Sequence, residues 1–333
     1  MQLALDGHPI HTRALSVSLS QLDGGKLGAV GELLDLRKRG FTPVGTELQG
    51  AGVIHQMGLD AVLDAETLVL ERIAERLSVV AFEASAATLG ESCRDVEGRL
   101  AALVGRRVDE RDLRDTVGGA LGCSHILALA QFLLASAAWG AGEHRAAAIG
   151  PSSPPLVHRR FFRRDLIVDG TEVEPGTLTV GLQLSDLLSV PAAATVTPAE
   201  RFAVHVELRV QMALQGWPAT ITQIRGARRR RERTGFAEAP WTDCGEPLAG
   251  LRGMTLGKGA NQELTRRLDA DPPLRDALRM LMPALIQCRA SFPDKWLNAA
   301  ATAPGHPGLI GMADSCYMWR RGGALEQGRS SRG

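Results

Sequence analysis

One order of elements occurs twice along this chain, and it constrains the fold more than any other feature. Residues 14–82 alternate apolar and polar side chains in the manner of strands, interrupted by turn residues such as Asp23-Gly24-Gly25. From Val96 the spacing becomes helical and leads to a strongly apolar helix predicted over 126–137, after Gly122. Strands followed by helices predict an α+β unit, with the helices packed on one face of an antiparallel sheet.

The same order returns after Pro151-Ser152-Ser153-Pro154-Pro155, a run of Pro and Ser that predicts a linker. Strands are predicted over 163–188, around a turn at Asp169-Gly170, and again over 202–224. An apolar helix is predicted over 274–288. The chain therefore contains two units with the same predicted sequence of strands and helices.

The two halves also align residue by residue at a shift of about 150 positions. Ile54-His55 falls on Val204-His205, and Cys93 falls on Cys244. Chance alignment of two stretches rich in Ala and Arg is the alternative, but the matching order of elements favours a tandem duplication. A duplicated unit is expected to pack as a pseudo-dimer that mimics a symmetric homodimer.

These observations predict a division of the chain into three parts. Residues 1–150 form a first unit that bears a Cys/His site, residues 151–325 form a degenerate second copy, and residues 326–333 form a disordered tail. The second copy lacks the start of the apolar helix, because Asp271-Pro272-Pro273-Leu274 stands where Gly122 to His125 is expected to map.

Composition excludes several classes of partner. The 38 Lys and Arg residues balance 37 Asp and Glu, the net charge is +1, and aromatic residues make up only 4%, so no nucleic-acid partner is expected. No secretory signal is visible, and the longest near-apolar stretch, 126–139, is too short to cross a membrane. Five widely spaced Cys residues do not resemble a secreted disulfide framework. We expect a cytoplasmic protein with reduced thiols, and the abundance of Ala, Gly and Arg indicates a bacterial source.

The densest local signal is the run Gly-Gly-Ala-Leu-Gly-Cys-Ser-His at 118–125, directly before the apolar helix. Three glycines, Gly118, Gly119 and Gly122, free the backbone for close approach of a cofactor or ligand. A tight turn with an inert buried cysteine is the alternative explanation for the same residues.

Cys123 is expected near a helix N-terminus, where the helix dipole stabilises a thiolate, and His125 follows two residues later. This pair suits a Zn or Fe ion, or a cysteine nucleophile with a basic partner. His55 and Cys93 stand at the ends of other predicted elements. We therefore predict a metal site of His55, Cys93, Cys123 and His125, with His125 and Cys123 as the candidate catalytic residues.

Several of these motifs together resemble an uncharacterised bacterial family, the domain of unknown function DUF2889. The resemblance covers about residues 11–140 and rests on Asp35 to Lys38, His55-Gln56-Met57, Cys93, Leu103-Val104-Gly105 and 118–125. Three features differ from the family pattern: no Pro follows Cys93, Ser124 replaces Thr, and Ile126 replaces Leu. The family carries no established activity, so the resemblance implies a fold unit and a residue set.

The order of motifs is also similar to iron–sulfur scaffold proteins of the NifU N-terminal type. That resemblance implies His55 at the scaffold's Asp position, Cys93 at its middle Cys, and Cys123 or His125 at its last ligands. The scaffold's first Cys is missing, because Val53 stands near that place. Mononuclear Zn or Fe binding therefore fits better than assembly of a cluster.

The resulting hypothesis is a metal-binding protein that acts on a small molecule at the Cys/His site. Two alternatives stay open: a metal-free enzyme with a cysteine nucleophile, and a non-catalytic scaffold or accessory protein of a partner enzyme, with a structural site. No membrane partner is expected, and the pseudo-dimer can form a further homo-oligomer.

Overall fold

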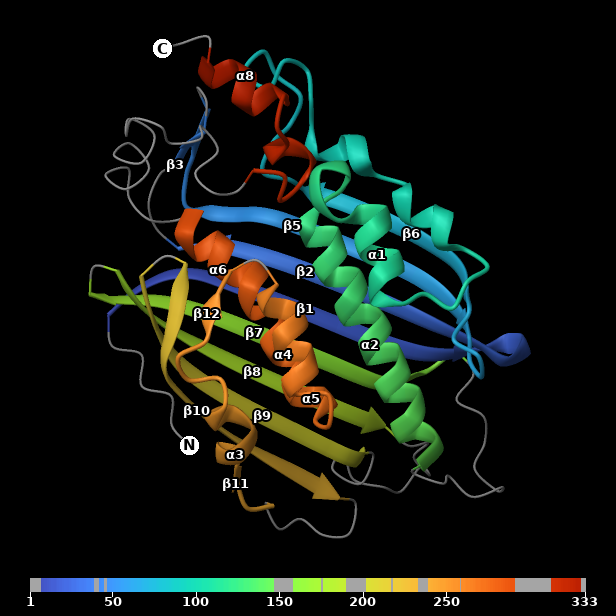
Figure 1. The fold of residues 1–333 in the computed structure, drawn as a ribbon. Helices are drawn as coiled ribbons and strands as arrows, with labels where there is room; N and C mark the ends of the chain where they lie inside the picture. Colours follow the sequence, from blue (N-terminus) through green and yellow to red (C-terminus); the bar gives the residue numbers. More distant parts are fainter. Residues whose placement is uncertain are drawn as a thin grey trace.

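One antiparallel sheet runs through both halves of the protein. The computed structural model describes residues 7–38, 42–44, 47–146, 158–174, 176–189, 202–216, 218–232, 239–257, 259–290 and 313–330. Within them, the sheet has ten strands in the order β11-β10-β9-β8-β7-β1-β2-β5-β6, and β12 pairs with β10 (Figure 1). The predicted α+β class with an antiparallel sheet is confirmed. The predicted linker at 151–155 lies outside the described residues.

The first half supplies four long strands that follow one another as a meander. They are β1 (His8–Leu22), β2 (Lys26–Arg37), β5 (Gly52–Asp64) and β6 (Leu70–Val79), and the short strands β3 (Thr42–Val44) and β4 (Glu47–Gln49) pair separately. The predicted β1–β2 hairpin is confirmed: the turn η1 (Asp23–Gly25) places Gly24 and Gly25 at φ 66° and 71°. A positive φ of this kind favours glycine.

The second half repeats the meander and ends in two short strands. The strands are β7 (Arg160–Glu174), β8 (Thr177–Ser189), β9 (Phe202–Gln215), β10 (Ala219–Glu232), β11 (Thr242–Asp243) and β12 (Thr255–Leu256). The predicted turn at Asp169-Gly170 is wrong, because both residues lie inside β7 and the chain turns near Gly176 instead. Gly170 is needed for packing, since a Cβ there would lie 2.3 Å from the Cys288 Sγ.

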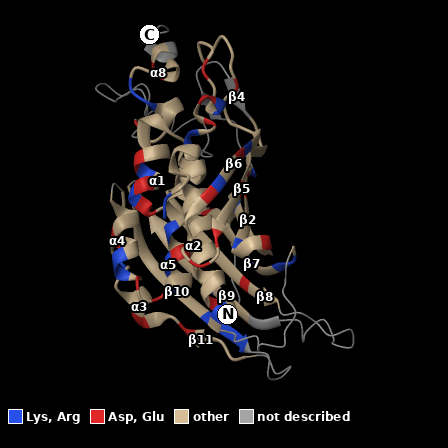
Figure 2. Ribbon diagram, turned by 90° about the vertical axis from the view of Figure 1, so that its right-hand side faces the viewer, with Lys and Arg blue, Asp and Glu red and all other residues tan. Residues whose placement is uncertain are grey.

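The helices gather on one face of this sheet, as Figures 1 and 2 show for α2, α4 and α5. The first half contains η2 (Cys93–Val96), η3 (Arg99–Leu103), α1 (Glu110–Val117), η4 (Gly119–Leu121) and α2 (Ser124–Ala146). The second half contains α3 (Gly245–Ala249), α4 (Ala260–Arg267), α5 (Pro272–Arg279), α6 (Leu281–Ala290), η6 (Tyr317–Trp319) and α8 (Ala324–Ser330). The helix predicted over 274–288 is thus two helices, α5 and α6.

The C-terminal helix α8 lies partly within the segment predicted to be disordered. Its Leu325 is buried against Phe82 and Met318, and its Ala324 N–H donates to the Glu91 carboxylate at 3.1 Å. These contacts anchor the start of α8 at Ala324 and Leu325, directly before the predicted tail, and disorder of residues 326–333 stays a prediction.

Side chains alternate along the strands between the helix-covered face and the open face. On β1, Val17 and Leu19 are fully buried while Ser16 and Ser18 lie on the other side, as the period of a strand requires. The buried side chains of both halves form one core. Among the described residues, α2 is the one helix long and apolar enough to cross a membrane, but 61% of its apolar window is buried, as expected for a core helix.

Candidate functional site

A buried carboxylate, Asp35, is the centre of a polar cluster on the helix-covered face. Asp35 lies on β2 directly opposite Arg13 of β1 and His55 of β5. Its two oxygens accept hydrogen bonds from the Arg13 Nε and Nη2 at 2.8 and 2.7 Å. Both side chains are fully buried, so this is a bidentate ion pair inside the core.

Three histidines surround the same carboxylate. The His55 Nδ1 and the His125 Nε2 lie 3.3 and 3.4 Å from the Asp35 Oδ2, and the His11 Nε2 lies 3.2 Å from its Oδ1. The rings of His55 and His125 are stacked with their centres 3.7 Å apart. Asp35, His55 and His125 each offer one ligand atom, and these atoms lie within 4.8 Å of one another.

Two of these contacts are short in distance but lack the geometry of a hydrogen bond. His55 Nδ1 and both ring nitrogens of His11 are buried without a hydrogen-bond partner among the described residues. His125 differs, because its Nε2 lies 2.9 Å from the Gln287 Nε2 of α6. Buried donors and acceptors normally find partners, so the cluster contains nitrogen atoms available to a ligand.

The protonation state of the cluster follows from its burial and from Arg13. Burial alone would raise the pKa of Asp35, but the charge and hydrogen bonds of Arg13 outweigh it and hold the pKa well below its usual range. Burial lowers the pKa of His125 well below 6.5, and the neighbouring His55 lowers it further. Burial also lowers the pKa of His11. Asp35 is therefore ionised at neutral pH, and the imidazoles of His11 and His125 are neutral.

The predicted ligands separate into two groups in the structure. His55 and His125 come together around Asp35, and the Cys123 Sγ lies 3.7 Å from the Nδ1 of His125. Cys93 is not part of the Asp35 cluster and packs instead against Phe82. Metal binding by the predicted set stays a prediction, and His125 is the residue that connects the two groups.

Cys123 does not have the predicted thiolate character. It directly precedes α2, yet burial raises the pKa of its thiol more than the backbone N–H groups of Ile126 and His125 lower it. Desolvation disfavours the charged form, and here it exceeds the effect of the helix N-terminus. This environment argues against the alternative of a metal-free cysteine nucleophile.

The glycines before α2 have a role in the turn itself. A Cβ on Gly122 would lie 2.0 Å from the Val117 carbonyl oxygen, and one on Gly118 would lie 2.5 Å from that of Arg114. Gly119 has φ 61°. The backbone thus occupies the space that a bound cofactor was expected to approach, and a cofactor-binding role for the three glycines stays a prediction.

Sequence reasoning missed four members of the cluster: Asp35 as a donor, His11, Arg13 and Gln287. Arg13 and Asp35 could have been found from the strand alternation. Arg13 lies two residues from Leu15 and Asp35 two residues from Leu33, so each charged residue shares the buried face of its strand with a leucine. Gln287 carries none, since it is 162 residues from the histidine that it contacts.

The second half holds a different buried cluster at the corresponding place. Arg164 of β7 donates to both oxygens of Asp186 on β8 at 2.7 Å and to Asp276 of α5 at 2.9 Å. Val206 of β9, and not His205, lies opposite Asp186. His205 is therefore one position away from the place opposite Asp186, and one position along a strand exchanges the two faces. The alignment of His55 with His205 stays a prediction.

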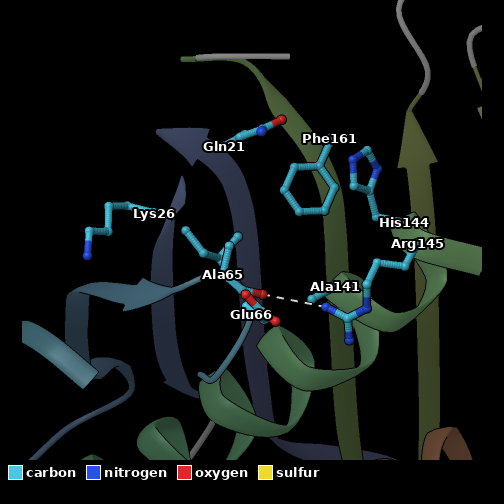
Figure 3. A pocket seen from close by; sticks show the side chains of 9 residues that line it. Gln21, Lys26, Ala65, Glu66, Ala141, His144, Arg145 and Phe161 are labelled. Atoms are coloured by element: carbon cyan, nitrogen blue, oxygen red, sulfur yellow. Dashed lines mark hydrogen bonds between the residues drawn. The ribbon is translucent and has the colours of Figure 1, made fainter. Parts of the chain in front are cut away.

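Two cavities lie away from the histidine cluster. One, of about 510 Å³, lies beside the β1–β2 hairpin and the end of α2, where Lys26, His144, Arg145 and Phe161 line it (Figure 3). The other, of about 490 Å³, opens on the face of the sheet without helices and is lined in part by Glu32, Arg76, Arg163 and Asp165. No residue of the cluster lines either cavity.

Comparison with known proteins gives one match. Residues 11–138 match the family model described as a protein of unknown function, DUF2889. The resemblance to DUF2889 is confirmed over this segment, which contains Asp35, His55 and His125 and ends before β7. Neither the curated proteins nor the solved structures include a match, and the similarity to the NifU type has no support from these searches.

Proposed function

We propose that Asp35, His55 and His125 bind a transition-metal ion, Zn or Fe. The observation that carries the proposal is the spacing of the donors: Asp35 Oδ2 lies 3.3 Å from the His55 Nδ1 and 3.4 Å from the His125 Nε2. Metal–ligand bonds of about 2.0–2.2 Å place the donor atoms around one ion roughly 3–3.6 Å apart. All three donor atoms lie within 4.8 Å of one another, so an ion would require the two nitrogens to approach one centre and the His125 Nε2 to exchange its contact with Gln287 for the metal.

The chemistry of the donors supports the same proposal. Two imidazoles and one carboxylate form the ligand set of non-haem Fe(II) sites and of many Zn sites. Such a set needs an ionised carboxylate and neutral imidazoles, and Arg13 and burial favour these states at Asp35 and His125. Arg13 would hold the carboxylate through both of its oxygens. The Gln287 amide contacts the His125 Nε2 itself, so it would have to give up this contact when the ion binds.

When bound, the ion would supply Lewis-acid chemistry, lowering the pKa of a water or polarising a small substrate. The chain's own contribution is to hold the ligands and exclude bulk water, because Asp35 is fully buried and His55 is 4% exposed. The most exposed ligand is His125, with 11% of its side chain accessible, so a small molecule would approach from its side. In the alternative of a non-catalytic scaffold protein, the same residues would hold a structural ion and no substrate would bind to it.

We also infer that the two halves derive from one unit. Arg13, Asp35 and His125 each have a counterpart at a constant offset of 151 residues, namely Arg164, Asp186 and Asp276. Both bidentate Arg–Asp pairs span 22 residues and join the first two strands of a meander. A pseudo-dimer about the β1–β7 contact follows from this arrangement.

The test is the metal content of the purified protein by mass spectrometry, after growth with added Zn and Fe. We expect His55→Ala to lose one equivalent of metal per chain. His205→Ala is the matched control, because His205 lies one position off the corresponding place and should leave the content unchanged. Equal metal content in the wild type and His55→Ala contradicts the proposal.

A further inference from the structure

A side chain from the second half of the chain reaches the Asp35 cluster. Gln287 lies on α6 with 8% of its surface exposed, and its amide Nε2 lies 2.9 Å from the Nε2 of His125. The two residues are 162 positions apart, so this contact joins α6 of the second half to α2 of the first. The candidate site is therefore in contact with a helix that lies outside residues 11–138, the segment that matches the family model.

Gln287 stands on a side of α6 that is otherwise apolar. Ala284 and Cys288, three positions before it and one after it, are buried with it, because the helical spacing places these residues on one side. A carboxamide buried among apolar side chains costs stability unless it forms a hydrogen bond. The contact with His125 meets this requirement and gives the amide a defined place in the core.

The contact also defines which nitrogen of His125 carries the proton. A carboxamide NH2 group donates hydrogen bonds and does not accept them, so the His125 Nε2 must be the acceptor. The proton of the neutral ring then lies on Nδ1, whose neighbour is the Cys123 Sγ at 3.7 Å. The lone pair of the Nε2 is therefore the one that Gln287 uses.

The same lone pair is the one that the proposed site offers to an ion. The His125 Nε2 lies 3.4 Å from the Asp35 Oδ2, where the ligand atoms converge. A metal ion binds an imidazole nitrogen at about 2.0–2.1 Å along the lone pair, and a hydrogen-bond donor approaches along the same direction. The Gln287 amide nitrogen, at 2.9 Å, therefore occupies the approach that the ion would use. Only one of them can hold the His125 Nε2 at a time.

We propose that Gln287 is a latch on the metal site, which competes with the ion for the His125 Nε2 and sets the affinity of the site. This inference rests on the proposed function, because it concerns the same ligands. Cys288 packs so closely on β7 that a Cβ on Gly170 would lie 2.3 Å from the Cys288 Sγ. This packing restrains α6, so the latch opens by rotation of the Gln287 side chain rather than by movement of the helix.

The latch gives the second half a role in the function of the first. Loss of one neutral hydrogen bond changes an equilibrium constant roughly 2- to 10-fold, so the latch lowers the affinity for the ion without preventing its binding. Because coupling between two binding events is reciprocal, binding of the ion in turn weakens the hold of α6 on the first half.

The experiment is a competition titration of the chelator-treated full-length protein with Zn²⁺ against a chromophoric chelator. We expect Gln287→Leu, which keeps a side chain of similar size but cannot donate, to bind Zn²⁺ roughly 2- to 10-fold more tightly than the wild type. His55→Ala identifies the signal, because it removes binding to this site. Gln183→Leu is the matched control, because Gln183 is exposed on the face of β8 without helices and should leave the affinity unchanged.

A second measurement does not need the metal. Nitrogen-15 NMR of the imidazoles in chelator-treated protein should find His125 protonated at Nδ1, and its Nε2 resonance should shift in Gln287→Leu because the hydrogen bond is lost. Protonation of the wild-type ring at Nε2 would overturn the latch, because the lone pair for which it competes would then be absent.

Two titration results would also overturn it. Equal affinity in the wild type and Gln287→Leu would mean that no competition exists, and weaker binding in the variant would make the amide a ligand. Both differ from a failure of the proposed function itself, in which His55→Ala binds as much Zn²⁺ as the wild type and the latch falls with the site.

Discussion

The two buried clusters use the same Arg–Asp pair for different purposes. In the first half, Arg13 faces one carboxylate and the remaining neighbours are imidazoles; in the second half, Arg164 faces two carboxylates, Asp186 and Asp276. The second cluster pairs its two carboxylates with two guanidinium groups, since Asp276 also accepts from the Arg275 Nε at 3.0 Å. The first cluster instead surrounds a single ion pair with three imidazoles. The comparison indicates that a shared structural pair can serve either packing or ligand binding, depending on the third residue supplied by a helix.

Removing Arg164 should have the largest effect on stability. Arg164→Met leaves Asp186 buried without its guanidinium partner and Asp276 with Arg275 alone. Loss of one partner of a buried ion pair costs about 3–5 kcal/mol of unfolding free energy. Arg163→Met is the matched control, because Arg163 pairs with Asp165 near solvent and should cost less than about 1 kcal/mol. Urea unfolding at pH 7.5 measures both, and equal effects would contradict a structural role for the buried triad.

Removing Arg13 should cost less, because the first cluster has another way to compensate its carboxylate. In Arg13→Met we expect a loss of about 3 kcal/mol at pH 8, at the lower end of the range for a broken buried ion pair, since Asp35 stays buried without its guanidinium partner. One nearby histidine can take up a proton as the pH falls, which restores a charge partner. The loss should therefore shrink between pH 8 and pH 6, and a constant loss over that range would count against histidine compensation.

Acidification should destabilise the wild-type protein, whereas it should reduce the stability loss caused by Arg13→Met. Burial lowers the pKa of His11 and His125 in the folded protein, whereas the unfolded chain binds protons near pH 6.5. The unfolded state therefore gains more protons on acidification, and stability should fall by about 1–2 kcal/mol between pH 6.5 and 5.5.

Chelator-treated protein is needed for that measurement, so that loss of a bound metal does not contribute. Urea midpoints at closely spaced pH values give the slope, which should become shallower in His11→Gln. A stability that rises on acidification over this range would mean that the buried histidines are protonated in the folded state.

Much of the fold could be predicted because local patterns specify it. The alternation along β1 and β2 and the glycines between them fix a hairpin, and the apolar run after Gly122 fixes α2. The turn at Asp169-Gly170 could not be placed from local signals, because Gly170 is selected by a thiol of α6 more than a hundred residues away. A glycine within a strand pattern can mark close packing as well as a turn.

Two residues of the candidate site could be predicted from the sequence, and the others depend on contacts between distant segments. His55 and His125 stand out because nitrogen donors at the ends of elements are chemically conspicuous. Asp35 does not stand out by residue type, because polar residues are common in strands. Its position on the same buried face as Leu33 is the signal that marks it. Gln287 becomes a neighbour of these residues only through contacts between the two halves.

The antiparallel contact of β1 with β7 has a consequence for how this protein is made. During synthesis β1 leaves the ribosome early, but its partner follows about 150 residues later, so one side of the first sheet has open hydrogen-bonding groups in the meantime. Nascent chains on the same messenger could pair through that side before their own β7 emerges. Slow translation through residues 147–159 would lengthen this interval, and chaperone binding to the half-made chain would cover the open strand edge while it lasts.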